Sequence, residues 1–479
     1  MPRVGTSLIS IALILILLVG CAPAVEEIPT ATTPAISDTP QVISSPRATL
    51  RPTESIFPDP SEGRIPVIFS HGGGPCDIGA VIYLSKYPNV DLIGMVLSRG
   101  EIHPENALNA WGVFLYDVLH SRDTAIALGT DERIDPNSHD FPEAWRGAAD
   151  NFWGLALPQA EYKYEVAAGP ELIVELVNAS PDKVTIVAMA SMIDVARALQ
   201  IDPGIIDNIA HVVIMGGAFT VPGNLNDDPT ITENQAAEWN MWIDSEAARY
   251  LFNSGVRVSI VPLDAIQYLV QPDDVAIMNA IDDPAVRYTA QNWSDQIGMN
   301  PGGFLIWDTI TIVAVTNPEF FDWTYDGVDV ITEAGAHQGQ TIALNNGATH
   351  TRYATGADYE AIMDQIFTTF RSVTQAMTIT ELGGTWEGST GVFHITFVLD
   401  PVCELNVKCG SFEIPEFSLT GDITFVDIDG DKYEFKATNL SSGEPSGALY
   451  EYLQIMEDGT LRYVTTGPDS INEAILTRK

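Results

Sequence analysis

The segment IPVIFSHGGGPCDIGAVIYL, residues 65–84, decides which class of fold the sequence predicts. An apolar run from Val67 to Phe69 leads into a cluster of glycines, and a single carboxylate, Asp77, precedes a second apolar run. This pattern predicts a strand, a tight loop and the start of a helix, which is where α/β proteins usually bind their ligands. The loop holds a histidine, a cysteine and only one acid, so its chemistry depends on what other segments bring to it.

The same alternation of strand and helix patterns continues to about Val373. Apolar runs typical of strands are separated by helical patterns such as 171–177, 195–199 and 246–252. Strands that alternate with helices predict an α/β fold, a mostly parallel sheet with helices on both faces. The strand runs are residues 67–69, 90–96, 184–188, 212–215 and 258–261. Ligands bind at the carboxyl ends of such strands, so the loops after these runs are where we search for a site.

The sequence changes character after about residue 380. Residues 381–479 alternate polar and apolar residues with a period of two, and Asp429-Gly430 and Asp458-Gly459 are typical of hairpin turns. We therefore expect a separate antiparallel β domain here, either a small barrel or a sandwich. Gly384-Thr385-Trp386 resembles the start of lipocalin-type barrels.

The first 63 residues predict an export signal and a tether. Arg3 precedes an apolar run, Ile9 to Val19, that is shorter than the roughly 20 residues a spanning helix needs. Residues 18–21, Leu-Val-Gly-Cys, resemble a bacterial lipoprotein cleavage box, so we expect a signal peptide over 1–20 and lipid on Cys21. Residues 22–63 are rich in Pro, Thr, Ser and Ala, which is typical of a disordered tether. The sequence thus predicts an exported bacterial lipoprotein, at the cell surface or in the periplasm, that meets the membrane only through its anchor.

The net charge limits the classes of ligand that we expect the protein to bind, and the cysteines indicate the redox environment that it meets. The formal net charge is −41, which argues against nucleic acid and leaves neutral small molecules and cations as ligands. An oxidising compartment permits a disulfide between Cys403 and Cys409, which leaves Cys76 unpaired. Nothing in these counts decides between a monomer and a homo-oligomer.

Several segments, in order along the chain, resemble the inosine–uridine-preferring nucleoside hydrolase family. They include VIFSHGGGPCDIGAV, VTIVAMASMIDVARAL, VVIMGGAFTVPGN, AEWNMWIDSEAARYLFNSGVRVSIVPLD, WDTITIVAVTNPEFF and TIALNNGATHTRYATGADYEAIMDQIF. The resemblance spans roughly residues 64–373, and we assign 64–375 to this domain. It implies hydrolysis of the N-glycosidic bond of a ribonucleoside or related riboside. It also implies a calcium ion that binds the attacking water and the ribose diol.

The resemblance places the metal site in the opening loop, where most of the family's aspartates are replaced. The first loop aspartate, a ligand and the general base, falls at Ser70, and the next two fall at Gly72 and Cys76. Only Asp77 keeps the family residue. The distal ligand falls at Asp308.

The remaining family positions fall on residues spread along the chain. The carbonyl ligand maps to the backbone of Ile193, and the ribose contacts map to Asn224, Glu238 and Asn240. Two further positions depart from the family: an asparagine after the second strand is Glu101, and a histidine that can aid the leaving group is Trp307.

Each of these residues also has a plainer interpretation. His71 could replace the base by its pKa, although alternation along the strand turns its side chain to the face opposite Ser70. Cys76 is either a small buried filler or, with His71 and Asp77, a ligand of a softer metal such as zinc. Asp77 and Asp308 could be helix caps, and the three ribose contacts could be loop and cap residues. Trp307 either packs in the core or stacks on a base.

We expect the chain to be an N-glycosyl hydrolase that acts on a ribonucleoside, with calcium held by Asp77, Ile193 and Asp308. The alternative is a catalytically silent riboside-binding module of a surface lipoprotein. The absence of an aspartate at Ser70 and of a histidine at Trp307 favours that alternative.

Overall fold

The computed structural model describes residues 57–60, 63–160, 166–300, 302–372, 382–401, 403, 408–429, 432–438, 450–456, 459–467 and 470–479. The signal peptide, Cys21 and most of the tether lie outside the described residues, so these predictions are not addressed by the structure. Within the described part of the chain, no helix has the length and hydropathy required to cross a membrane.

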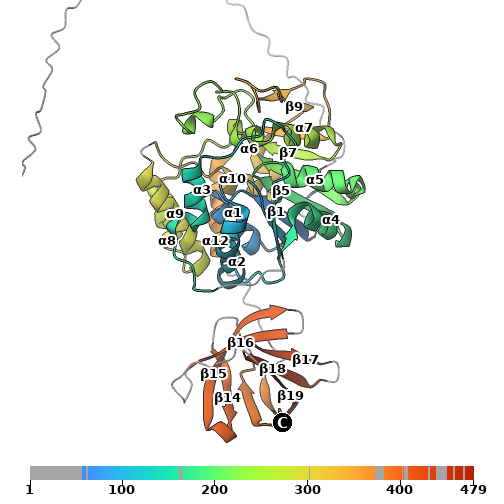
Figure 1. Ribbon diagram of the computed structural model, residues 1–479. Coiled ribbons are helices and arrows are strands. Elements are labelled where there is room, and N and C mark those ends of the chain that lie inside the picture. The colour runs from blue at the N-terminus through green and yellow to red at the C-terminus, as the bar shows by residue number, and fades with distance from the viewer. Residues whose placement is uncertain are drawn as a thin grey trace, which may run out of the picture. The chain divides into compact units, whose positions relative to one another are not determined.

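A nine-stranded sheet organises the larger part of the described chain (Figure 1). All of its neighbouring strands pair in parallel except β8, which runs antiparallel to β11. The predicted α/β fold with a mostly parallel sheet is confirmed. In spatial order the strands are β4 (Ala167–Ala168), β3 (Ala125–Leu128), β2 (Val90–Leu97), β1 (Ile65–His71), β5 (Val184–Met189), β6 (Ile209–Met215), β7 (Val258–Val261), β11 (Thr351–Ala357) and β8 (Phe321–Tyr325).

Helices cover both faces of this sheet. They are α1 (Asp77–Lys86), α2 (Pro104–Val113), α3 (Glu143–Asp150), α4 (Gly169–Ala179), α5 (Ile193–Ile201), α6 (Trp239–Ile243), α7 (Ser245–Asn253), α8 (Pro272–Asn279), α9 (Pro284–Met299), α10 (Trp307–Thr311), α11 (Val313–Thr316) and α12 (Tyr359–Arg371). A short hairpin, β9 (Val328–Val330) and β10 (Thr341–Ala343), lies outside the sheet.

The alternating side chains of β1 show why helices are needed on both faces. Val67 and Phe69 belong to the core shared with α1, α9 and α12, whereas Ile68 belongs to the core shared with α4, α5 and α7. In Figure 1 these two groups of helices lie on opposite sides of the sheet. Val67, Ile68 and Phe69 have no exposed surface, as expected for a strand that is covered twice.

The loops after β1 and β2 approach each other closely at the carboxyl edge of the sheet. A Cβ atom on Gly100 would lie 2.6 Å from the Cα atom of Gly72, so the two backbones can meet only because both residues are glycine. Ile102 N–H donates to the Gly72 carbonyl at 2.9 Å and fixes this contact. The loop that carries Asp77 is thereby placed beside the segment that carries Glu101.

The described strands between residues 384 and 478 form a closed antiparallel barrel, which confirms the predicted antiparallel β domain and is one of the two architectures expected for it. Its strands are β12 (Gly384–Ser389), β13 (His394–Leu399), β14 (Lys408–Ile414), β15 (Leu419–Asp429), β16 (Lys432–Thr438), β17 (Tyr450–Ile455), β18 (Leu461–Gly467) and β19 (Ser470–Arg478). Pairing of β12 with β19 closes the barrel, and rings such as Phe397, Phe435 and Tyr463 pack together in its core. Trp386 is buried and donates to the Leu382 carbonyl at 2.7 Å.

The structure pairs Cys403 with Cys409 as a disulfide between the chain after β13 and strand β14. Cys76 is a free, buried thiol. Both features agree with the predicted use of the cysteines.

Asp244 links the long loop after β3 to α7 and provides a test of the larger domain. Its buried carboxylate accepts from Ala247 N–H at 2.9 Å, Ile134 N–H at 2.7 Å and Asp135 N–H at 2.9 Å.

We predict that Asp244→Ala lowers the free energy of unfolding by about 3 kcal/mol, because a cap is lost and buried donors lose their partner. Urea denaturation measures this loss. The control Asp202→Ala removes a partly exposed cap on Gly204 N–H and should cost about 1 kcal/mol or less; equal losses would contradict the prediction.

Candidate active site

The loop after β1 holds the Asp77 carboxylate against its own backbone. Asp77 is the first residue of α1 and is 1% exposed, and its Oδ2 atom accepts from Gly74 N–H at 2.8 Å. The helix cap itself is Cys76, which makes no side-chain cap bond, so the interpretation of Asp77 as a helix cap is wrong. The other oxygen, Oδ1, is buried and has no hydrogen-bond partner among the described residues. An unpaired buried carboxylate oxygen is costly unless a ligand or ion approaches it.

Cys76 connects the loop to the distal acid. Its thiol donates to Asp308 Oδ2 at 2.9 Å, across 232 residues of sequence. Burial, followed by the charges of Asp308 and Asp77, raises the pKa of the Cys76 thiol well above its usual value. Cys76 is therefore a protonated donor that orients Asp308. Asp308 follows the first residue of α10, whose cap is Ile306, so the helix-cap interpretation of Asp308 is wrong as well.

Glu101 brings a third carboxylate to the same place. The point where a Cβ atom on Gly74 would lie is 3.5 Å from Glu101 Oε1, 3.6 Å from Asp77 Oδ2 and 3.7 Å from Asp308 Oδ2. The sequence showed that Glu101 stands where the family has an asparagine, but it did not show that the side chain reaches the loop. The Glu101 side chain reaches the loop because the backbones at residues 72 and 100 approach each other closely, and the sequence alone does not reveal that approach.

The crowding of these acids changes their protonation. Burial and the charge of Asp77 raise the pKa of Asp308 well above its usual value, and burial raises that of Asp77 although backbone N–H groups of the loop oppose the shift. Burial, then the charges of Asp77 and Asp308, raises the pKa of Glu101 to about 8. The three carboxylates thus repel one another in a poorly hydrated place, and a cation would relieve that repulsion.

Ser70 and His71 are both buried and contact polar groups of neighbouring residues. The Ser70 hydroxyl is buried and lies 2.6 Å from the Ser98 hydroxyl, which donates to Asp194. The two side chains alternate as predicted, but His71, not Ser70, is on the side of Asp77: its Nδ1 atom lies 3.5 Å from Asp77 Oδ2. Burial lowers the pKa of His71 to about 3, and Nδ1 accepts from Gly73 N–H at 3.2 Å. His71 as a substitute base stays a prediction, and its ring is neutral and packed on Phe69 and Trp111.

The predicted ribose contacts lie after β6 and at the start of α6. The Glu238 carboxylate caps α6 by accepting from Asn240 and Met241 N–H, and it also accepts from Gly217 N–H at 3.0 Å. Burial raises the pKa of Glu238 to about 7 against the effect of these bonds. Glu238 is therefore a cap residue in addition to its expected role, and its charge reaches Asp308.

The two asparagines differ in how much of their side chain is available. Asn240 Nδ2 donates to the Met215 carbonyl at 3.1 Å, at the end of β6. Asn224 Oδ1 accepts from Trp239 N–H at 3.1 Å, whereas Asn224 Nδ2 is buried and has no partner among the described residues. Of the three predicted contacts, Asn224 thus has the donor that a sugar hydroxyl could satisfy.

Ile193 and Trp307 each begin a helix, and their expected roles at the site stay predictions. Ile193 is fully buried and begins α5. Trp307 begins α10 beside Asp308 and packs partly against the core, while its buried Nε1 atom has no partner among the described residues. The structure agrees with the interpretation of Trp307 as a residue that packs against the core. Its indole N–H has no hydrogen-bond acceptor among the described residues.

Comparisons with known proteins agree with this geometry. The family model described as inosine-uridine preferring nucleoside hydrolase matches residues 67–364. The chain belongs to this family. A probable uridine nucleosidase 2 of Arabidopsis thaliana is 26% identical over 286 residues, which cover 58% of this chain and 86% of that protein. The pyrimidine-specific ribonucleoside hydrolase RihA of Salmonella newport is 28% identical over 291 residues, covering 58% and 88%.

Solved structures support the nucleoside hydrolase fold of the larger domain. A purine-preferring ribonucleoside hydrolase from Gardnerella vaginalis has a TM-score of 0.58 and 23% identity, and the match covers 65% of this chain and 99% of that one. The plant nucleoside hydrolase PpNRh1 has a TM-score of 0.55 and 21% identity, covering 64% and 99%.

The carboxylate oxygens at this site of the nucleoside hydrolase are the type of ligand that a hard cation prefers, although the acids are spread apart. Among the described residues, no three His, Cys, Asp or Glu side chains stand close enough to form a complete metal site. One oxygen of each of the Asp77, Glu101 and Asp308 carboxylates nevertheless lies within 3.7 Å of the point where a Cβ atom on Gly74 would lie, and Asp77 Oδ1 has no hydrogen-bond partner among the described residues. Calcium takes six to eight oxygen ligands, so these acids would draw together around it, with carbonyls and water completing the shell. The zinc alternative has little support because Cys76 and His71 are engaged by Asp308 and Gly73.

The crowded carboxylates predict a pH-dependent stability. In the presence of a chelator, we expect the thermal midpoint of the protein to fall between about pH 5 and about pH 8.5. The folded-state pKa of Glu101, about 8, exceeds the 4.5 of the unfolded chain, so the stabilisation present below pH 4.5 is lost as the pH rises through 8. In Glu101→Gln that fall should be smaller by at least about 3 °C, measured by calorimetry.

Glu105→Gln is the matched control, because Glu105 is exposed on α2 in the same segment. Its profile should follow that of the unmodified protein. Equal slopes for Glu101→Gln and the unmodified protein would contradict the crowding of Glu101 with Asp77 and Asp308.

Proposed function

We propose that this chain hydrolyses the N-glycosidic bond of a ribonucleoside or a related riboside. The observation that carries the proposal is the convergence of the Asp77, Glu101 and Asp308 carboxylates beside Gly74, at the carboxyl edge of the sheet. The related proteins named above are described as nucleosidases or ribonucleoside hydrolases, which supports the same reaction for this chain. Homologous sequence covers the part of the chain that carries these acids.

Negative charge at this place suits the reaction. Cleavage of an N-glycosidic bond proceeds through a transition state in which positive charge grows on the sugar, and preorganised carboxylates stabilise that charge. Asp77 is held by Gly74 N–H and Asp308 by the Cys76 thiol, so neither acid needs to reorganise during the reaction. Ser70 and Gly72 offer no carboxylate, so the acids available to take a proton from the attacking water are Asp77, Glu101 and Asp308.

A calcium ion is part of this proposal. Asp77, Asp308 and Glu101 would hold it with their carboxylates, with the Ile193 carbonyl as the expected backbone ligand. When bound, the ion lowers the pKa of a water molecule and orients it against the sugar. The chain's own residues do the rest: Asn224 offers an unpaired donor to the ribose, while Glu238 and Asn240 shape the site around Met215 at the end of β6.

A catalytically silent riboside-binding module is the second candidate. It is favoured by the Ser70 hydroxyl, which lies at the family's base position and is engaged by Ser98. In that case Asn224 and the buried acids would bind a riboside without cleaving it. Either function fits a lipid-anchored exported protein that meets neutral ribosides outside the cell, as a monomer or a homo-oligomer.

The acids that converge beside Gly74 predict the outcome of an activity assay. The purified protein should release ribose from a ribonucleoside in the presence of Ca²⁺, and a chelator should lower the rate. Asp77→Asn and Asp308→Asn should each lower kcat/KM at least ~100-fold, because each removes charge that stabilises the transition state. Ribose release over a panel of purine and pyrimidine nucleosides measures both effects.

Asp273→Asn is the matched control, because Asp273 is an exposed acid on α8. It should keep full activity. If no nucleoside is cleaved but one of them raises the thermal midpoint of the protein, the silent binding module is correct. Loss of activity in Asp273→Asn equal to that in Asp77→Asn would contradict the assigned site.

A further inference from the structure

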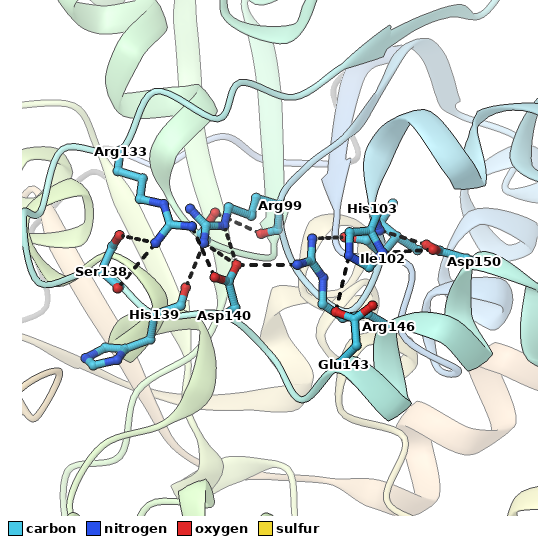
Figure 2. Close-up of polar contacts among 11 residues, drawn as sticks. Arg99, Ile102, His103, Arg133, Ser138, His139, Asp140, Glu143, Arg146 and Asp150 are labelled. Atoms are coloured by element: carbon cyan, nitrogen blue, oxygen red, sulfur yellow. Dashed lines mark hydrogen bonds and ion pairs between the residues drawn. The ribbon is translucent and has the colours of Figure 1, made fainter.

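Three arginines converge on the single carboxylate of Asp140 (Figure 2). Arg99 binds Asp140 Oδ1 through Nε, at 3.0 Å, and through Nη2. Arg133 Nη2 donates to Asp140 Oδ2 at 3.1 Å, and Arg146 Nη1 lies 3.5 Å from Oδ1. We call Arg99, Arg133 and Arg146 the arginine cluster.

The arginine cluster carries more positive charge than its partner can balance. One carboxylate neutralises one guanidinium, so two of the three positive charges stay uncompensated by Asp140. The nearby acids Glu143 and Asp150 bind His103 instead, Glu143 at 3.5 Å from Nε2 and Asp150 at 2.8 Å from Nδ1 (Figure 2). This local excess of positive charge contrasts with the formal net charge of the chain, which is −41.

Two donor atoms of the arginine cluster have no hydrogen-bond acceptor in the part of the chain that the structure describes. Arg99 is only 2% exposed, and its Nη1 atom has no hydrogen-bond partner among the described residues. The Nε atom of Arg146 is also buried and also has no hydrogen-bond partner among the described residues. A buried charged donor without a partner is costly, and Asp140 leaves both of these donors unsatisfied.

The arginine cluster is tied to the segment that carries Glu101. Arg99 follows β2, and its carbonyl accepts from the Ser191 hydroxyl at 2.9 Å. Arg146 Nη2 donates to the Ile102 carbonyl at 3.1 Å, and Ile102 N–H holds the Gly72 carbonyl. One segment, residues 99–102, therefore joins the arginine cluster to the loop of the candidate active site.

We propose that the arginine cluster binds an oxyanion, a phosphate or carboxylate group of a ligand, in the place that the Asp140 carboxylate occupies. A guanidinium presents parallel N–H donors that match two oxygens of such a group, and three guanidiniums match a phosphate dianion in charge. The Asp140 side chain is 41% exposed in an irregular loop, so an anion from solvent can displace it.

The protonation of Asp140 agrees with its role as a stand-in anion. Burial alone would raise the pKa of Asp140, but the hydrogen bond and charge of Arg99 and the charge of Arg133 hold it below its usual value. The site thus stabilises a negative group strongly enough to overcome the cost of burying it.

Isothermal titration calorimetry of the full chain with inorganic phosphate, and separately with acetate, tests the oxyanion site. We expect phosphate to bind, Arg133→Gln to weaken binding about tenfold, and Asp140→Asn to strengthen it several-fold by removing the competing carboxylate. Arg287→Gln is the control, because Arg287 is 62% exposed and pairs with Asp282, and it should bind phosphate as the unmodified protein does. Stronger binding of acetate than of phosphate would identify a carboxylate as the ligand group.

Binding of neither anion to the unmodified protein or to Asp140→Asn would overturn the proposal, and so would equal weakening by Arg133→Gln and Arg287→Gln. Arg133 is 42% exposed, so its substitution should leave the fold intact. Measuring ribose release from a nucleoside by the same protein separates this proposal from the proposed function. Cleavage of the nucleoside without anion binding leaves the proposed function standing alone, whereas anion binding without any cleavage leaves the oxyanion site standing alone.

Discussion

The backbone after β1 lies directly against the backbone after β2, because neither Gly72 nor Gly100 has a side chain to separate them. A Cβ atom on Gly100 would lie 2.6 Å from the Gly72 Cα atom, closer than van der Waals contact permits. The parallel sheet brings the two strand ends to the same edge, and the glycines then let the loops touch. Everything proposed for the site depends on this contact, since it places Glu101 beside Asp77 and Asp308.

Charge is unevenly distributed around that contact. On one side three carboxylates crowd together, where burial raises the pKa values of all three and the charges of neighbouring acids raise those of Glu101 and Asp308 further. On the other side the arginine cluster surrounds a single carboxylate. The segment from Arg99 to Ile102 separates these two regions and belongs to both.

The sequence was enough to predict the sheet, its covering helices and the antiparallel C-terminal domain, because strand and helix periodicities are local properties. It also indicated Asp77 and Asp308. It could not show that Cys76 donates to Asp308, since 232 residues separate them, or that His71 turns toward Asp77. Whether residues 381–479 form a barrel or a sandwich depends on the pairing of β12 with β19, which joins the two ends of the domain. The arginine cluster depends on an irregular loop that has no periodicity to recognise.

A crystal structure of the protein grown with Ca²⁺ and ribose tests the central claim most directly. The account predicts an ion bound between the carboxylates of Asp77, Glu101 and Asp308, with the sugar within hydrogen-bond distance of the Asn224 amide. An ion bound by Asp77 and Asp308 with Glu101 turned away would contradict the role given to Glu101. Absence of both the ion and the sugar from this edge of the sheet would contradict the site itself.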